Sequence, residues 1–138
     1  MHRVFVYGTL KRGYPNYAGN MDTARFVGDF RTRERFPLVL GGPWYSVYLL
    51  DEPGKGHQVR GEVFEVDDEA LAVLDRLEST HLPDGYRRET CEIETPAGEV
   101  AGEAWVYLRQ RIHVDGIHDT LTDFYPLEGR YIPPWKRD

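Results

Sequence analysis

Hydrophobic and polar residues alternate along most of this chain with the period of a β-strand. Between residues 58 and 66, Val59, Gly61 and Val63 fall on one face, while Phe64 and Val66 fall on the other. A period of two indicates a strand, because successive side chains point to opposite faces of a sheet. Further short runs, rich in β-branched and aromatic residues and bounded by Gly and Pro, predict strands over residues 4–7, 24–28, 36–40, 44–50, 86–95 and 100–108. The last two runs flank a Pro-Ala-Gly turn and are expected to form a hairpin.

One segment follows a helical period instead. Asp67 is placed to cap a helix, and residues 70–77 carry apolar side chains at helical spacing. Because a helix advances by about 100° per residue, Leu71, Leu74 and Glu78 share a face. We therefore expect the helix to pack with Leu71 and Leu74 toward the core and to carry Glu78 along the border of that face.

Many short strands and one clear helix predict a mixed α/β (α+β) fold. The natural closure is a small, barrel-like, mostly antiparallel sheet with one main packed helix. Residues 1–138 are expected to form a single domain, since no linker, repeat or low-complexity segment interrupts them. From residue 112 onward the chain is irregular, with one short helix expected near residues 119–124.

Charge and cysteine content narrow the class of partner. The net charge is −6, which argues against nucleic acid, and Arg31, Arg33 and Arg35 are expected on an exposed strand edge or loop. No stretch approaches the roughly 20 apolar residues of a membrane span, so no membrane partner is expected. Cys91 is the only cysteine and is expected to be a buried structural thiol in a strand. The single cysteine and the lack of a membrane span favour a cytoplasmic protein. We further expect a small-molecule partner and a monomer or weak dimer.

Glu78 is the first candidate for chemistry. A carboxylate that points into an apolar wall is costly unless it is paired or protonated. Burial would raise its pKa toward neutrality, the range that suits a general acid or base. The alternative is that Glu78 is simply the last helical residue and bends into water.

The second candidate is the sequence Tyr7-Gly8-Thr9-Leu10, which follows the first strand. Glycine at the end of a strand lets the backbone approach a ligand closely, and successive N–H groups in such a turn can bind an anion. The alternative is an ordinary bulge.

Metal and phosphate sites are not expected. None of the five histidines forms an i, i+4 pair, and no second cysteine is available. The glycines near the N-terminus are not followed by the Gly-Lys-Ser/Thr of a phosphate loop, and there is no Gly-x-Ser-x-Gly nucleophile turn.

Several segments, taken in order, resemble the γ-glutamylcyclotransferase-like superfamily and most closely its γ-glutamylamine cyclotransferase branch. They are residues 4–13 (VFVYGTLKRG) followed by Pro-Asn, residues 61–66 (GEVFEV), residues 74–78 (LDRLE), residues 86–88 (YRR), and the Arg-Tyr at residues 130–131 with Pro133. The resemblance covers most of the chain. One segment departs from it, because residues 79–85 look longer than is usual for the branch.

The resemblance implies a barrel-like α/β domain and an enzyme that needs no metal and no cofactor. It places the acid/base on Glu78 and the binding of the glutamyl group on Tyr7, Gly8, Thr9 and Leu10. The implied reaction releases 5-oxoproline and a free amine from a γ-glutamyl amine. Two alternatives stay open: a cyclotransferase for γ-glutamyl amino acids or a γ-glutamyl-protected metabolite, and a non-catalytic binding module of the same fold.

The loop at residues 79–85 bears on the leaving group. It contains no Lys or Arg, and Asp84 would repel an anion if it faced the pocket. This favours an amine without a carboxylate beside the scissile nitrogen, unless Arg87 or Arg88 turns inward.

Overall fold

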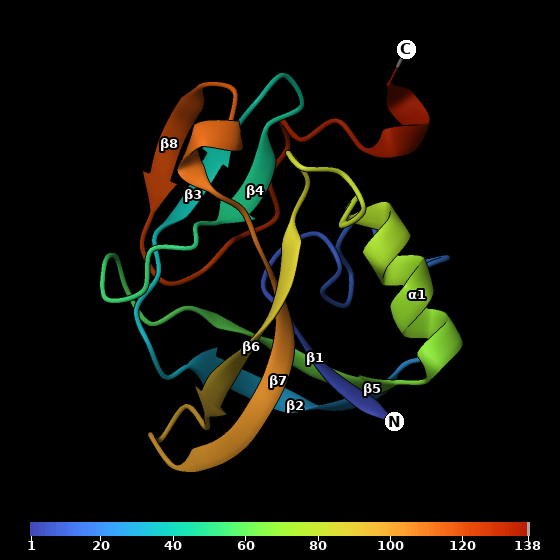
Figure 1. Cartoon of the computed structure of the whole chain (residues 1–138), viewed down its shortest axis with the longest axis vertical. Coiled ribbons are helices and arrows are strands. Elements are labelled where there is room, and N and C mark those ends of the chain that lie inside the picture. Colours follow the sequence, from blue (N-terminus) through green and yellow to red (C-terminus); the bar gives the residue numbers. More distant parts are fainter. Residues whose placement is uncertain (138) are drawn as a thin grey trace.

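The computed structural model describes residues 1–137 (Figure 1). These residues form eight strands, one α-helix and two short 3₁₀ helices. The strands are β1 (His2–Val6), β2 (Arg25–Thr32), β3 (Leu38–Gly41), β4 (Ser46–Leu49), β5 (Arg60–Val66), β6 (Arg87–Glu94), β7 (Val100–Leu108) and β8 (Ile117–Leu121). The helix α1 spans Asp68–Leu77, and the 3₁₀ helices span Arg111–His113 and Pro134–Lys136.

Five strands close into a barrel in the order β1-β5-β2-β6-β7. All neighbours are antiparallel except β1 and β7, which meet in parallel where Val4 lies opposite Trp105. The predicted barrel-like, mostly antiparallel sheet is therefore confirmed, as is the hairpin of β6 and β7. The main core cluster includes Phe5, Val63, Ile93 and Val106, all fully buried.

Helix α1 packs on one face of the barrel and confirms the predicted element. The Asp67 side chain accepts a hydrogen bond from the Ala70 amide at 2.7 Å, as expected of an N-cap. Leu71 and Leu74 pack in a second core cluster that also holds Phe64 and Val66 of β5. The helix thus explains why β5 is apolar on both faces near its end: one face serves the main core and the other is covered by α1.

The strands β4, β3 and β8 form a second, three-stranded sheet beside the barrel (Figure 1). The helix expected near residues 119–124 is wrong, because β8 ends at Leu121 and pairs antiparallel with β3. Pairing with a distant strand satisfies the backbone of this segment. The strand predicted from residue 44 begins only at Ser46, since Tyr45 has φ 51 and lies in a turn.

The expectation for Cys91 is confirmed. Cys91 is buried in β6, and burial raises the pKa of its thiol to about 12, so it is not a thiolate at neutral pH. Arg33 and Arg35 are exposed as expected. Arg31 is only half-buried and does not lie on a strand edge, because β2 pairs with both β5 and β6, and its side chain donates to Glu94 at 2.6 Å. None of the helices between residues 1 and 137 is long and apolar enough to cross a membrane.

Candidate active site

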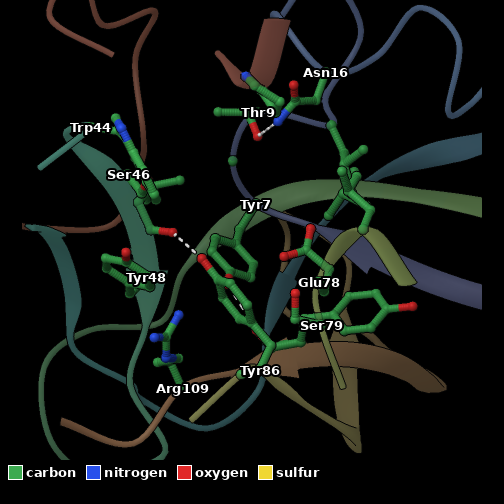
Figure 2. Close-up of a pocket in the computed structure, with 18 of the residues that line it drawn as sticks. Tyr7, Thr9, Asn16, Trp44, Ser46, Tyr48, Glu78, Ser79, Tyr86 and Arg109 are labelled. Carbon is green, nitrogen blue, oxygen red and sulfur yellow. Dashed lines mark hydrogen bonds between the residues drawn. The ribbon is translucent and has the colours of Figure 1, made fainter. Parts of the chain in front are cut away.

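A cavity of about 440 Å³ opens between the end of β1, the end of α1, β4 and the C-terminal segment. All five residues singled out from the sequence line it: Tyr7, Gly8, Thr9, Leu10 and Glu78. Figure 2 shows Trp44, Ser46 and Tyr48 along one side of this pocket, and Glu78 with Ser79 along the other. The fold therefore brings together two sequence motifs that lie some seventy residues apart.

The backbone of Glu78 is fixed by the end of the helix. Glu78 is the C-cap of α1, and its amide donates to the Leu74 carbonyl at 2.9 Å. Ser79 turns the chain sharply with φ 56, and the Tyr86 amide closes the following loop on the Glu78 carbonyl at 3.1 Å. A left-handed residue directly after the helix turns the chain away from the helical path. Glu78 thus neither continues the core-facing stripe nor bends into bulk water: it projects into the pocket (Figure 2).

The carboxyl group of Glu78 is held in an environment that favours its neutral form. The residue is half-buried, and none of the hydrogen bonds among residues 1–137 involves its carboxyl oxygens. Burial raises the pKa of Glu78 to about 7, against an opposing pull from the positive charge of Arg109. The negative end of the helix dipole acts in the same direction as burial. A carboxyl with this pKa and no protein partner can accept a proton from a ligand at neutral pH.

This arrangement predicts a pH-dependent cost in stability. The pKa of Glu78 is about 7 in the folded protein, above its ordinary value of 4.5. Between these values the folded state holds a proton that the unfolded state releases, so stability falls as pH rises through this window. We expect Glu78→Gln to be more stable than the unmodified protein by about 3 kcal/mol at pH 8 and to show no such gain at pH 4.

Urea unfolding at pH 4, 6 and 8 measures this effect. Glu69→Gln is the matched control, since Glu69 is exposed on the same helix. A stability difference between Glu78→Gln and the unmodified protein that stays constant across the three pH values contradicts the account.

The loop at Tyr7–Leu10 is a tight turn with unused backbone donors. The Lys11 amide donates to the Gly8 carbonyl at 3.1 Å, and the Asn16 amide donates to the Thr9 carbonyl at 2.8 Å. The amides of Gly8, Thr9 and Leu10 donate none of the hydrogen bonds found in the described chain. The loop therefore offers backbone N–H groups beside the pocket, as a ligand-binding turn requires.

Gly8 is required by space and not by backbone strain. A Cβ at Gly8 would lie 2.4 Å from Cγ1 of Val47, and Gly8 is not among the residues with positive φ. This close approach brings the turn against β4. The close approach to a ligand that the sequence predicts at this glycine stays a prediction.

Tyr7 contributes its ring to the pocket but not a free hydroxyl. Its hydroxyl donates to the Tyr107 carbonyl at 2.7 Å and accepts from the Leu49 amide at 3.3 Å. Burial also raises the pKa of Tyr7 far above its usual value. The prediction that Tyr7 binds the glutamyl group is accordingly narrowed to contact with the ring.

Sequence reasoning missed a cation in the pocket. Arg109 lies over the rings of Tyr48 and Tyr86, at 5.1 and 5.3 Å, and donates to the His113 carbonyl at 3.0 Å. Arg109 directly follows β7. Its backbone forms an isolated parallel β-bridge with Leu50, just after β4, and this places the residue at the pocket. No local pattern marks it.

The charges that line the pocket differ from those expected from the loop at residues 79–85. Asp84 lines the pocket, whereas Arg87 and Arg88 do not, and Arg88 bonds to Asp75 at 2.8 Å. The pocket nevertheless contains Arg109 and Arg137, so it is not free of positive charge. The loop composition alone therefore does not decide the leaving group.

The loop at residues 79–85 is a compact turn that forms part of the pocket wall. Leu82 and Gly85 donate amide hydrogen bonds to the carbonyls of Ser79 and Leu82, at 3.0 and 3.1 Å. This loop shapes the cavity, which is lined by Ser79, Leu82, Asp84 and Gly85. Within residues 1–137, His, Cys, Asp and Glu form no group of three that could hold a metal ion.

Comparison with known proteins matches this chain to one family. The family model described as gamma-glutamyl cyclotransferase, AIG2-like, matches residues 4–127. The chain belongs to this family. It is 37% identical over 139 residues to the gamma-glutamylaminecyclotransferase of Rattus norvegicus, covering 98% of this chain and 83% of the rat protein. It is 36% identical over 151 residues to the gamma-glutamylaminecyclotransferase of Homo sapiens, covering 96% and 97% of the two chains.

A solved structure agrees with the assignment to the gamma-glutamyl cyclotransferase, AIG2-like family. The crystal structure of an AIG2-like protein from Mus musculus superposes with a TM-score of 0.73 at 32% identity. The superposition covers 94% of this chain and 98% of the mouse chain. The family match includes Glu78 and the whole Tyr7–Leu10 loop, but it ends at residue 127, before the last part of the pocket wall.

Proposed function

We propose that this chain is a γ-glutamylamine cyclotransferase that releases 5-oxoproline and a free amine from γ-glutamyl amines. The observation that carries the proposal is the placement of a half-buried, unpartnered Glu78 in the same pocket as the free amides of residues 8–10. The names of the rat and human relatives support the class of substrate.

The reaction we propose is intramolecular. The α-amine of the glutamyl group attacks the γ-carbonyl carbon, a new C–N bond closes the five-membered ring, and the bond to the leaving amine breaks. No water is consumed. Because nucleophile and carbonyl belong to one molecule, the protein has mainly to hold the folded rotamer and to move a proton.

Glu78 is proposed to move that proton. A free α-amine has a pKa of about 8 and must lose a proton before it attacks. The pKa of Glu78 is raised to about 7, which is close to that of the α-amine. The carboxylate can therefore accept this proton and return it to the leaving amine. Backbone N–H groups of the Tyr7–Leu10 loop are proposed to stabilise negative charge on the substrate.

The competing function is a binding module that holds a small acid without turnover. The burial of Glu78 disfavours it, since a site that only binds an acid gains nothing from an inward carboxylate. The expectation of one domain acting in the cytoplasm as a monomer or weak dimer stays a prediction.

We predict that γ-glutamyl amines are better substrates than γ-glutamyl-α-amino acids. The relatives' names carry this expectation. The charge of the pocket wall does not add to it, because Arg109 and Arg137 line the pocket together with Asp84. The measurement is kcat/KM for γ-glutamyl-ε-lysine and for γ-glutamyl-alanine in one buffer, with 5-oxoproline as the product scored. We expect a ratio on the order of tenfold or more, equivalent to about 1.4 kcal/mol.

A higher value for γ-glutamyl-alanine rejects the amine preference and leaves the cyclisation standing. Binding without release of 5-oxoproline from either compound rejects the enzyme and favours the binding module.

A further inference from the structure

The C-terminal segment, residues 128–137, lies beyond the family match and yet completes the pocket. Tyr131, Pro134 and Arg137 line the cavity. The segment is anchored to the opposite wall, because the Ile132 amide donates to the Trp44 carbonyl at 3.0 Å. These residues therefore contribute to the pocket from outside the segment that the family model matches.

Asn16 connects the C-terminal segment to the Tyr7–Leu10 loop. It is only 6% exposed, and its side-chain nitrogen donates to Oγ1 of Thr9 at 2.8 Å and to the hydroxyl oxygen of Tyr131 at 2.9 Å. Figure 2 shows the bond between Asn16 and Thr9 at the end of the pocket that carries the loop. An amide nitrogen has two hydrogens, so both are committed, one to each hydroxyl.

Counting donors and acceptors then leaves two protons for a ligand. The Tyr131 oxygen also accepts from Nη2 of Arg137 at 3.4 Å, so both of its acceptor positions are occupied and its own proton has to point elsewhere. The Thr9 oxygen accepts one hydrogen bond, from the Asn16 nitrogen, and this bond does not use the proton of the Thr9 hydroxyl. Within residues 1–137 no acceptor is found for either hydroxyl proton, and both side chains line the pocket.

We propose that the hydroxyls of Thr9 and Tyr131, oriented by Asn16, form a two-point anion site that binds the α-carboxylate of the glutamyl group. Both hydroxyl oxygens accept hydrogen bonds from the same nitrogen, Nδ2 of Asn16, so they lie close enough for one carboxylate to bridge them. The guanidinium of Arg137 beside Tyr131 adds positive charge. The inference rests on the proposed function, and it leaves the amides of Gly8, Thr9 and Leu10 for the γ-carbonyl oxygen.

Thr9→Val and Tyr131→Phe test the site, because each removes a hydroxyl and keeps the side chain's shape. Each lost bond to a carboxylate should raise KM about tenfold or more, with kcat changed by less than about threefold. Tyr17→Phe is the matched control: Tyr17 lies in the same N-terminal loop, packs on Phe64 and does not line the pocket.

A substrate analogue separates binding from a structural effect. The same variants are assayed on the γ-glutamyl amine and on its analogue without the α-carboxylate, a 4-aminobutyryl amide that cyclises to 2-pyrrolidone. We expect the two variants to lose activity on the first compound and to match the unmodified protein on the second. Equal losses on both compounds, or an unchanged KM on the first, overturn the proposal.

Asn16→Asp tests the direction of the bonds. The introduced carboxylate has no proton to give and accepts from both hydroxyls, which removes their protons from the pocket. We expect at least a hundredfold loss in affinity for 5-oxoproline, measured by calorimetry. Retained affinity would show that Thr9 and Tyr131 donate to residue 16 and not to the ligand, which overturns the proposal.

Calorimetry with 5-oxoproline also keeps this test distinct from that of the proposed function. The product retains the α-carboxylate, so Thr9→Val and Tyr131→Phe should each weaken its binding about tenfold even in a protein without turnover. Absence of turnover in the unmodified protein rejects the cyclotransferase, whereas equal binding of 5-oxoproline by the variants rejects the anion site.

Discussion

Replacing Glu78 with glutamine is expected to lower the release of 5-oxoproline by on the order of a thousandfold while the fold stays intact. Glutamine keeps the size of the side chain but cannot accept the proton of the α-amine. No hydrogen bond to the Glu78 carboxyl holds the fold together, so nothing structural is lost. The backbone bonds that fix this residue, to Leu74 and from Tyr86, do not depend on the side chain.

Turnover and thermal melting are measured on the same preparation, with Glu69→Gln as the control on the exposed side of α1. The control should keep full activity. A Glu78→Gln protein that melts no lower than the unmodified protein and turns over within about tenfold of it would remove Glu78 from the mechanism.

Gly8→Val is expected to damage both the site and the packing around it. A Cβ at Gly8 would lie 2.4 Å from Cγ1 of Val47, and Val47 is itself buried. Either the turn moves away from β4 or Val47 is displaced, and both change the pocket. We expect kcat/KM to fall at least tenfold and stability to fall by about 1–3 kcal/mol, as is usual for overpacking.

Two further variants make the test specific. Gly129→Ala is the control, since a Cβ there has no neighbour within 4 Å, and it should be neutral. Val47→Ala in the Gly8→Val background opens space for the added side chain and should restore part of the lost stability. An unchanged kcat/KM in Gly8→Val would show that the turn makes no close contact with substrate.

The parts of the fold that follow local patterns were predictable. The alternation in β5 and the cap at Asp67 each arise from residues close in sequence, so pattern and structure agree. The strand β8 was not predictable in this way, because most of its side chains are exposed and it is stabilised by pairing with β3, which lies nearly eighty residues earlier. A segment without apolar periodicity carries no local signal of its partner.

The same division holds for the candidate site. Glu78 and Gly8 could be found because helical spacing and a strand-ending glycine are local features. Arg109 and Tyr131 could not, since they reach the pocket only through the return of the chain: Tyr131 meets Asn16 across 115 positions. For this reason the absence of Lys and Arg from residues 79–85 did not predict the charge of the pocket, which Arg109 and Arg137 also line.

The central claim is that the γ-glutamyl bond is broken by the substrate's own amine and not by water. The most direct test is to incubate the protein with γ-glutamyl-ε-lysine in ¹⁸O-labelled water and to analyse the products by mass spectrometry. The account predicts unlabelled 5-oxoproline and free lysine in equal amounts, and no cleavage of the same compound with an acetylated α-amine. Glutamate carrying ¹⁸O, or cleavage of the acetylated compound, would contradict it.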